Sequence, residues 1–246
     1  MKKTLFLTLV LMSSLAVAQD GPELEQIVVT ATKRETQLKD TPISMSVESA
    51  EDLEERHVQS LLDLGDGSVP GLNVATFEAR QTALTIGIRG IVPLDANQPA
   101  REQGVGVYID GVYLGRQHGL NAALLDIERI EVLKGPQGTL FGRNTSGGAL
   151  SIVTKKPTGF LEGTVKAGAG NYGSNNIEAH INLPEVANIS TKIDFISQYQ
   201  DATIENPLEG QAGWNFFDRT GARFSADWQG DYTNIYFTAD VGTDNN

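Results

Sequence analysis

The sequence predicts two structural regions, an α+β domain at residues 41–157 and a run of antiparallel strands at residues 158–246. The first prediction rests on Asp110-Gly111, which separates two β-branched and aromatic runs and is a strong short-range signal for a hairpin. The second rests on alternation, since apolar and polar residues take turns along segments such as 176–183 and 234–241. Side chains alternate between the faces of a strand, so each such segment has one apolar and one polar face.

Two short helices are expected before the strands of the first region. Ser49 and Asp52 have the spacing of a capping box and predict a helix over residues 50–57. Ser60 begins a second helix that ends at the glycines after Leu64. Strands are then expected at residues 72–76, 83–88, 104–115, 127–135 and 148–156, with an exposed loop at residues 91–103.

The first 18 residues have the three-part pattern of a secretory signal peptide, with two lysines, an apolar run and a small-residue cleavage motif. The net charge of −12 becomes −14 when these residues and their two lysines are removed. Such an acidic chain is unsuited to nucleic acid, which needs a basic surface. The absence of cysteine excludes disulfides, thiolate metal sites and cysteine nucleophiles. No later segment is apolar enough to span a bilayer as a helix.

The sequence offers no motif for catalysis, a cofactor or a metal. The string "GAGNYG" at residues 168–173 is followed by an alternating strand, whereas a dinucleotide site needs a helix there. His57, His118 and His180 are far apart, and His57 and His180 are expected to be solvated. Glu128 and Glu131 flank Arg129 on a strand, which favours structural ion pairs. We therefore expect no catalytic residue, no cofactor and no metal ligand.

The alternating strands are compatible with two architectures. A soluble sandwich turns its apolar faces inward. An outer-membrane barrel turns them outward to lipid and keeps polar residues inside. Alternation alone does not distinguish between them.

The segment "LEQIVVTATKRE" at residues 24–35 contains a short β-favouring run, residues 27–30, with no second run near enough to form a hairpin. An unpaired strand edge invites pairing with another chain. The run is therefore expected either to join a sheet or to remain free for a partner.

Five segments together resemble the TonB-dependent outer-membrane receptors. They are "EQIVVTATKRE", "TPISMSVESAEDL", "LTIGIRG", "GVGVYIDGVYLGR" and "IERIEVLKGPQGTLFGRNTSGGALSIVTKKP". The resemblance covers essentially the whole mature chain. It implies a periplasmic TonB box, a plug domain made of a small mixed sheet with short helices, and a transmembrane barrel around that plug. It also implies import of a scarce nutrient, a ferric siderophore, haem, cobalamin or an oligosaccharide, powered by the TonB–ExbB–ExbD complex.

The resemblance assigns roles to particular residues. The TonB box would comprise Ile27, Val28, Val29, Thr30 and Ala31, which would pair with a strand of TonB by β-augmentation. Ligand contacts at the outward apices of the plug would come from Arg89, Asn97, Arg101, Arg116, Gln117 and His118. Ion pairs between plug and barrel would involve Arg129, Glu131 and Arg143.

The resemblance implies a signal peptide at residues 1–18, a TonB box and linker at 19–40, a plug at 41–157 and a partial barrel at 158–246. The last region has room for about five strands of ~10 residues, whereas the family barrel has 22. We therefore expect the amino-terminal part of an outer-membrane receptor, unable to transport alone, with its plug and TonB box facing the periplasm. The eight residues before the box leave no space for a signalling domain. The alternative is a soluble periplasmic ligand-binding module.

Overall fold

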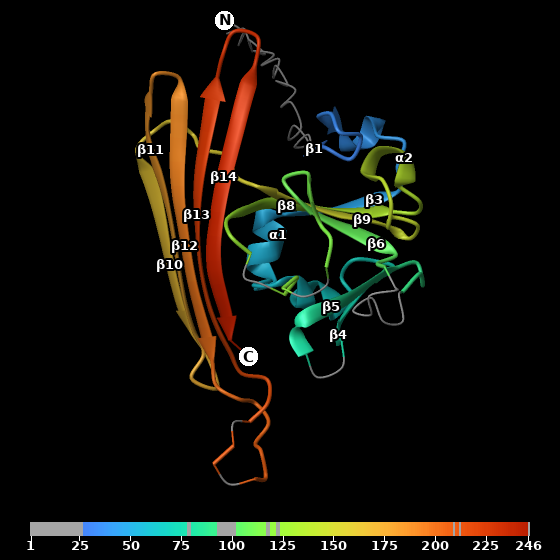
Figure 1. Cartoon of the computed structure of the whole chain (residues 1–246), viewed down its shortest axis with the longest axis vertical. Helices are drawn as coiled ribbons and strands as arrows, with labels where there is room; N and C mark the ends of the chain where they lie inside the picture. The colour runs from blue at the N-terminus through green and yellow to red at the C-terminus, as the bar shows by residue number, and fades with distance from the viewer. Residues whose placement is uncertain are drawn as a thin grey trace, which may run out of the picture.

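The computed structural model describes residues 27–77, 80–92, 102–116, 119–121, 124–208, 210–211 and 213–245. The predicted signal peptide and the segment up to residue 26 lie outside these residues. Figure 1 shows a long curved sheet standing beside a smaller, mixed α/β body. We call the first the long-stranded sheet and the second, the described residues from Thr41 to Pro157, the plug unit.

The long-stranded sheet contains five antiparallel strands in chain order. They are β10 (Glu162–Ala169), β11 (Asn175–Val186), β12 (Ile189–Gln200), β13 (Phe217–Gln229) and β14 (Asn234–Asn245). Residues 187–188 and 230–233 connect strands at the upper end in Figure 1, and the five-residue connection 170–174 lies at the opposite end. The connection between β12 and β13 spans residues 201–216 and extends from the opposite end. The predicted antiparallel strands are confirmed.

The plug unit is built on a mixed sheet in the order β3-β8-β9-β6-β7. Its strands are β3 (Met45–Ser49), β6 (Val105–Ile109), β7 (Val112–Leu114), β8 (Ile127–Lys134) and β9 (Gly148–Thr154). The strands β6 and β9 are parallel and the other pairs antiparallel. The predicted hairpin turn is confirmed: Asp110 and Gly111 both have positive φ, 48° and 83°, which suits a two-residue hairpin. A second hairpin, β4 (Leu72–Phe77) with β5 (Arg80–Ile88), packs beside this sheet.

The predicted caps form as expected. The helix α1 (Ala50–Glu55) begins at Ser49, whose side chain and backbone exchange hydrogen bonds with Asp52, at 3.1 and 3.0 Å. The second helix, η2 (Leu61–Asp66), is a 3₁₀ helix capped by Ser60 and ended by Gly67 at a φ of 87°. Four short elements were not predicted: β2 (Thr36–Gln37), η1 (Leu38–Asp40), β3 and α2 (Gly138–Phe141). Among the described residues, no helix is both long and apolar enough to cross a membrane.

Replacing Ser49 with alanine should lower the stability of α1 by about 0.5–2 kcal/mol, because the amide of Asp52 loses its acceptor, the Ser49 hydroxyl. Hydrogen exchange of the α1 amides would measure the change. Replacing Ser146, an exposed loop residue, with alanine is the matched control and should shift exchange by less than about 0.5 kcal/mol. Equal effects of the two substitutions would contradict the assignment of the cap.

The mixed sheet separates two apolar clusters. One contains Leu61, Leu64, Ile86, Val107 and Ile130, and it packs η2, β4 and β5 on one face of the sheet. The other face carries a smaller cluster, made of Val29, Ala31, Tyr108, Leu133, Phe141 and Ala149. The second cluster therefore joins residues just before the plug unit to β6, β8, β9 and α2.

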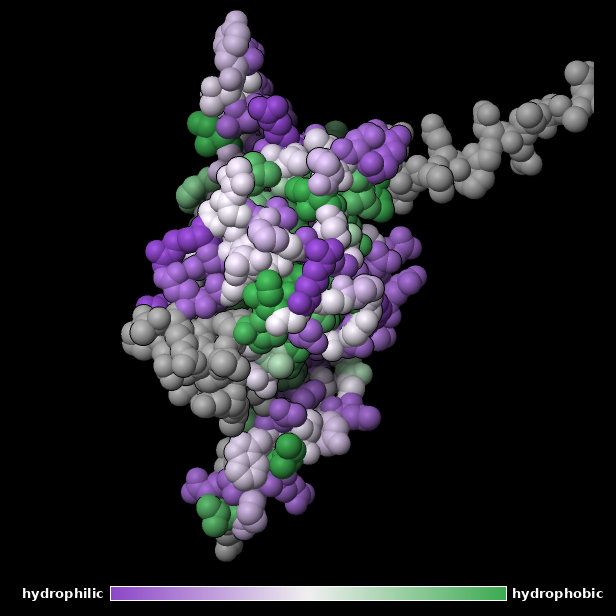
Figure 2. All heavy atoms as spheres, turned by 90° about the vertical axis from the view of Figure 1, so that its right-hand side faces the viewer, coloured by the Kyte–Doolittle hydropathy of each residue, from purple (hydrophilic) through white to green (hydrophobic). Residues whose placement is uncertain are grey.

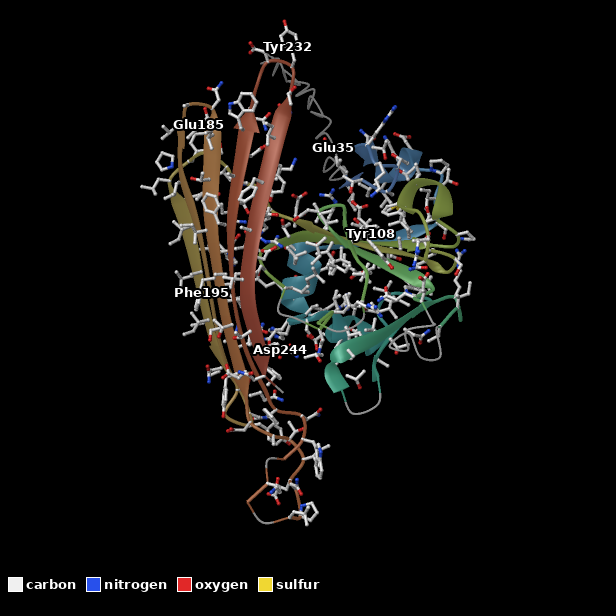
Figure 3. The ribbon with its side chains drawn as sticks, in the orientation of Figure 1. Glu35, Tyr108, Glu185, Phe195, Tyr232 and Asp244 are labelled. Atoms are coloured by element: carbon white, nitrogen blue, oxygen red, sulfur yellow. The ribbon has the colours of Figure 1, made fainter. Side chains whose placement is uncertain are left out.

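The two faces of the long-stranded sheet have opposite character. The polar face packs on the plug unit and buries His180, Lys192, Asp194 and Arg223. The other face leaves large apolar side chains exposed, namely Ile177, Ile181, Ile193, Phe195, Phe224, Phe237 and Val241. Figure 3 shows Phe195 on the side away from the plug unit and Asp244 on the side facing it. A soluble sandwich would bury its apolar face. Here that face is exposed, so of the two architectures compatible with the sequence the structure agrees with the wall of a membrane barrel.

Candidate functional site

The 27–31 segment, the predicted TonB box, lies against the plug unit. Within it, β1 (Val28–Val29) pairs with β2 (Thr36–Gln37), and the amide of Leu38 donates to the carbonyl of Ile27 at 2.9 Å. Val29 and Ala31 are fully buried in the smaller apolar cluster. The expectation that this run has no hairpin partner is therefore wrong. The pairing covers only two residues, and its β2 side is polar. The segment is therefore stabilised by the packing of Val29 and Ala31 on the mixed sheet and not by a second apolar strand.

Glu131, in the middle of β8, is the centre of the contact. Its Oε1 accepts hydrogen bonds from the amide of Thr30 at 2.8 Å, from the hydroxyl of Thr30 at 3.1 Å and from Nε of Arg129 at 2.8 Å. The side chain of Glu131 is fully buried. Hydrogen bonds to an ionised acceptor are about twice as strong as neutral ones. The carboxylate therefore fixes Thr30, the fourth residue of the segment, to the sheet.

Lys33 adds a second attachment just after the segment. Its Nζ lies 4.1 Å from the ring centre of Phe141 and 5.1 Å from that of Tyr108, within the range of a cation–π contact. The Tyr108 hydroxyl donates to the carbonyl of Phe141 at 2.5 Å, which holds the two rings together. Burial lowers the pKa of Lys33 from its ordinary value.

This geometry has a consequence for pairing with another chain. Strand addition uses the backbone donors and acceptors of an exposed edge. Here β2 occupies one edge of β1, and Glu131 accepts the amide hydrogen of Thr30. The amide of Thr30 must separate from Glu131 before it is available to a partner strand.

Arg129, Glu131 and Arg143 were predicted to form ion pairs between plug and barrel. Their partners among the described residues lie within the plug unit or in the 27–31 segment. Arg129 pairs with Glu128 and Glu131 on its own strand, and Arg143 pairs with Glu102 on the exposed surface of the plug unit. Among the described residues, the link to the long-stranded sheet is made by other groups. These ion pairs are Glu54 with Lys166 at 2.5 Å, Asp110 with Arg223 at 3.4 Å, and Asp126 with Lys192.

Lys192 is the best-buried cation of this interface, with 1% of its surface exposed. Its Nζ contacts Asp126, lies 3.2 Å from Oδ1 of Asp194 and donates to the carbonyl of Lys155 at 2.9 Å. Burial by itself would raise the pKa of Asp126. The hydrogen bond and charge of Lys192, with His180 and Lys155 nearby, instead hold that pKa below its ordinary value.

His180 was expected to be solvated, and the structure shows that this is wrong. It is buried, and its Nδ1 lies 2.9 Å from Oδ1 of Asp194. The sequence places it on the polar face of β11, but that face packs on the plug unit. Ligand atoms of Asp126, His180 and Asp194 lie within 4.8 Å of one another, a grouping that could hold a metal ion. The ammonium group of Lys192 sits among them and supplies the positive charge that the two acids require.

Two cavities lie between the plug unit and the long-stranded sheet. The larger, about 500 Å³, is lined by α1 together with β10 and β11, and its polar residues include His57, Lys166 and Asn176. The smaller, about 300 Å³, lies beside β13 and β14 and combines apolar plug residues with Arg219 and Asp244. On the side opposite the long-stranded sheet, the plug unit presents mostly hydrophilic and intermediate residues with separate hydrophobic patches (Figure 2).

Two of the six predicted ligand residues, Arg89 and Arg116, lie within the described residues, so the predicted ligand site stays a prediction. Arg89 has a φ of 53° and donates to the hydroxyl of Ser44 at 2.7 Å, so it ties the end of β5 to the chain just before β3. Arg116 is exposed just after β7. Asn97, Arg101, Gln117 and His118 lie outside the described residues.

Comparison with known proteins gives a consistent result. A family model described as "TonB-dependent Receptor Plug Domain" matches residues 37–149. The chain is 29% identical over 203 residues to the pesticin receptor of Yersinia pestis, covering 81% of this chain and 29% of that protein. It is 34% identical over 171 residues to the iron-regulated outer membrane virulence protein of Vibrio cholerae, covering 66% of this chain and 25% of that protein.

The fold is also that of solved receptors. The ferric yersiniabactin uptake receptor FyuA of Yersinia pestis superposes with a TM-score of 0.72 at 24% identity, covering 81% of this chain and 31% of that one. The chain thus spans less than a third of the length of these relatives. The plug match, the mixed sheet beside an apolar-faced barrel wall and the named relatives agree: residues 37–149 belong to the plug domains of TonB-dependent receptors, and the chain resembles these outer-membrane receptors in sequence and fold.

Proposed function

We propose that this chain is the amino-terminal part of an active-transport receptor, which imports an iron chelate and offers residues 27–31 to TonB. The observation that carries the proposal is the docking of this segment. It is short and extended, pairs with β2 over two residues, and is held to the plug unit by the burial of Val29 and Ala31 and by the carboxylate of Glu131. A segment held in this way can be released without unfolding the mixed sheet.

The direction of the sheet supports the same function. Outer-membrane barrels have short periplasmic turns and longer extracellular loops. The connections at the upper end, residues 187–188 and 230–233, are shorter than those at the opposite end, residues 170–174 and 201–216, which supports a periplasmic assignment of the upper end. The strand β1 lies toward that end of the plug unit (Figure 1), which supports the proposal that TonB, driven by ExbB and ExbD, binds residues 27–31. The exposed apolar face of the long-stranded sheet would contact outer-membrane lipid.

The substrate class rests on the relatives. One is named an iron-regulated protein and another a ferric yersiniabactin uptake receptor. A ferric siderophore is therefore the proposed substrate, ahead of haem, cobalamin and oligosaccharides. The soluble-module alternative is disfavoured because it would leave the apolar residues of β11, β12 and β14 in water.

The test is the substitution Val29→Pro in the full-length outer-membrane protein. Proline has no amide hydrogen and cannot donate in a strand ladder. We expect energy-dependent uptake of the ferric chelate to be lost while binding of the chelate to cells is retained. Val29→Ile keeps the backbone and is the matched control, with uptake expected to remain.

Uptake would be measured with labelled ferric siderophores, and with haem, cobalamin and maltodextrin as the competing substrates. Undiminished uptake by the Val29→Pro protein would overturn the TonB-coupled function. Uptake of cobalamin but of no ferric chelate would retain the coupling and overturn the proposed substrate.

A further inference from the structure

We propose that the smaller cavity between the plug unit and the long-stranded sheet, here called the wall cavity, binds a small molecule with an apolar body and one primary carboxamide group. Its volume of about 300 Å³ is at the lower end of the range found for small-molecule sites. The inference goes beyond the proposed function. It does not depend on which chelate is imported, and it is tested by binding alone.

Two glycines on neighbouring strands form the floor of the wall cavity. Gly221 of β13 and Gly242 of β14 are paired in the register of the sheet, and both line the cavity. Neither has a positive φ, so the backbone conformation does not require glycine at these positions. A Cβ atom at Gly221 would lie 3.7 Å from Cδ1 of Leu125 in the plug unit. A side chain at this position would therefore extend into the space between the sheet and the plug unit.

The plug unit lines the same cavity with branched apolar side chains, among them Leu125, Ile127 and Ile152. Ile152 is buried in the larger apolar cluster and Ile127 packs against that cluster, so the core of the plug unit holds both in place. Cavities with apolar walls take up apolar ligands. The body of the ligand is therefore expected to be apolar, and flat enough to lie on the backbone of two adjacent strands.

Two Arg–Asp pairs flank the glycines along β13 and β14. On one side, Nε of Arg223 donates to Oδ1 of Asp240 at 2.6 Å, and Nη1 of Arg223 reaches Asp110. On the other side, Nε of Arg219 lies 3.5 Å from Oδ2 of Asp244. Within the described part of the chain, Nε of Arg219 and both carboxylate oxygens of Asp244 have no hydrogen-bond partner. The first pair is therefore satisfied, whereas the second retains an unused donor and unused acceptors.

The Arg219–Asp244 pair is placed to meet a ligand. Both residues line the cavity, and only 4% of the surface of Arg219 is exposed. Asp244 lies on the side of the sheet that faces the plug unit (Figure 3). The guanidinium carbon of Arg219 lies 4.4 Å from the ring centre of Phe217, a cation–π contact that limits its movement. A buried polar group without a hydrogen bond is costly, so a ligand that supplies the missing partners gains affinity.

A primary carboxamide supplies both kinds of partner at once. Its carbonyl oxygen can accept from Nε of Arg219, and its two N–H groups can donate to the oxygens of Asp244. A carboxylate would place a second negative charge beside Asp244, and an ammonium group would place a second positive charge beside Arg219. Like charges brought together in a binding site are unfavourable. The pair therefore selects a neutral head group that both donates and accepts.

The test is a calorimetric titration of naphthalene-2-carboxamide into the full-length receptor in lipid nanodiscs, corrected with empty nanodiscs. We expect saturable binding. Naphthalene-2-carboxylate and naphthalen-2-ylmethylamine carry a negative and a positive head on the same apolar body, and each should bind at least about tenfold more weakly. Absence of saturable carboxamide binding would show that water alone fills the cavity and would overturn the proposal. Equal affinities of the three probes would overturn it as well.

Two variants locate the site. Gly221→Val should weaken carboxamide binding at least about tenfold, because the new side chain occupies the floor of the cavity. Ala222→Val is the matched control, since it introduces the same residue on the opposite face of β13 and should bind as the wild type does. Carboxamide binding that is unchanged in Gly221→Val would overturn the proposal.

Asp244→Asn removes one charge and leaves the glycine floor intact, so it tests the site even if Gly221→Val does not fold. With the negative charge gone, Arg219 should attract an anion, and naphthalene-2-carboxylate should bind at least as tightly as the carboxamide. A carboxylate that is still excluded from this variant would overturn the role given to the Arg219–Asp244 pair.

Discussion

Replacing Glu131 with alanine is expected to destabilise the plug unit by about 3–5 kcal/mol and to free residues 27–31 from the mixed sheet. The carboxylate is fully buried and accepts three hydrogen bonds, from two groups of Thr30 and from Arg129. Without it, the guanidinium of Arg129 keeps only Glu128 as an ionic partner in the described contacts, and the Thr30 amide loses its acceptor. Hydrogen exchange of the β8 amides in the full-length protein would measure the loss.

Trypsin provides a direct readout of the released segment. Lys33 and Arg34 lie two and three residues after the segment, so cleavage after them should accelerate in the Glu131→Ala protein. Glu128→Ala is the matched control, because it removes the more exposed partner of Arg129 and leaves the Thr30–Glu131 contact intact. That control should cost less than about 1 kcal/mol and leave cleavage unchanged. The same cleavage rate in both variants would contradict the role given to Glu131.

The same substitution has a consequence for partner binding under the proposed function. A partner that binds only the released segment has an apparent affinity proportional to the fraction of molecules in which the segment is released. Glu131→Ala should therefore tighten binding of the TonB carboxy-terminal domain to the receptor without ligand. Weaker binding would show that Glu131 helps to present the segment rather than to retain it.

Features that depend on neighbouring residues were predictable from the sequence. The capping residues Ser49 and Ser60 and the turn at Asp110-Gly111 each form within a few residues, and the structure contains all three. The docking of Thr30 on Glu131 was not predictable, because these residues are 101 positions apart. Local patterns describe residues 27–30 as a β-favouring run but do not say which surface covers it.

The polar faces of the long strands show the same limit. Alternation correctly separates the two faces of β11 and β12, and it does not say which face another unit covers. His180 therefore reads as solvated in the sequence, although the plug unit buries it. Asp110 likewise reads as a turn residue, and its contact with Arg223, 113 positions away, comes only from the packing of the plug unit on β13.

Replacing Lys192 with alanine is expected to weaken the attachment of the plug unit by about 3–5 kcal/mol and to create a zinc site. The ammonium group lies between the carboxylates of Asp126 and Asp194, and its removal leaves these two acids with only His180 and Lys155 as cationic partners among the described contacts. Aspartate oxygens and a histidine nitrogen are suitable ligands for Zn²⁺. Their ligand atoms already lie within 4.8 Å of one another, and truncation to alanine clears the space among them.

Acid stability should change with the same substitution. In the wild type the pKa of Asp126 is lowered, so its contribution is present above the unfolded value of about 3.9 and is lost as the pH falls through the folded value. Without Lys192, the pKa of Asp126 loses its strongest lowering influence, and burial then acts against His180 and Lys155 alone. The loss of protection of the β8 amides should therefore begin at a higher pH in Lys192→Ala than in the wild type.

Adding Zn²⁺ to Lys192→Ala would show whether the substitution opens a cation site or only removes packing. A ligand present at 100 times its dissociation constant stabilises the folded state by about 2.7 kcal/mol, so added Zn²⁺ should restore much of the protection lost in Lys192→Ala. Lys192→Met is the matched control, because it removes the charge while an unbranched side chain still fills the space. It should be destabilised and should not respond to zinc. Equal stabilisation of the wild type, or no response in Lys192→Ala, would show that Lys192 does not occupy a site that a metal ion can take.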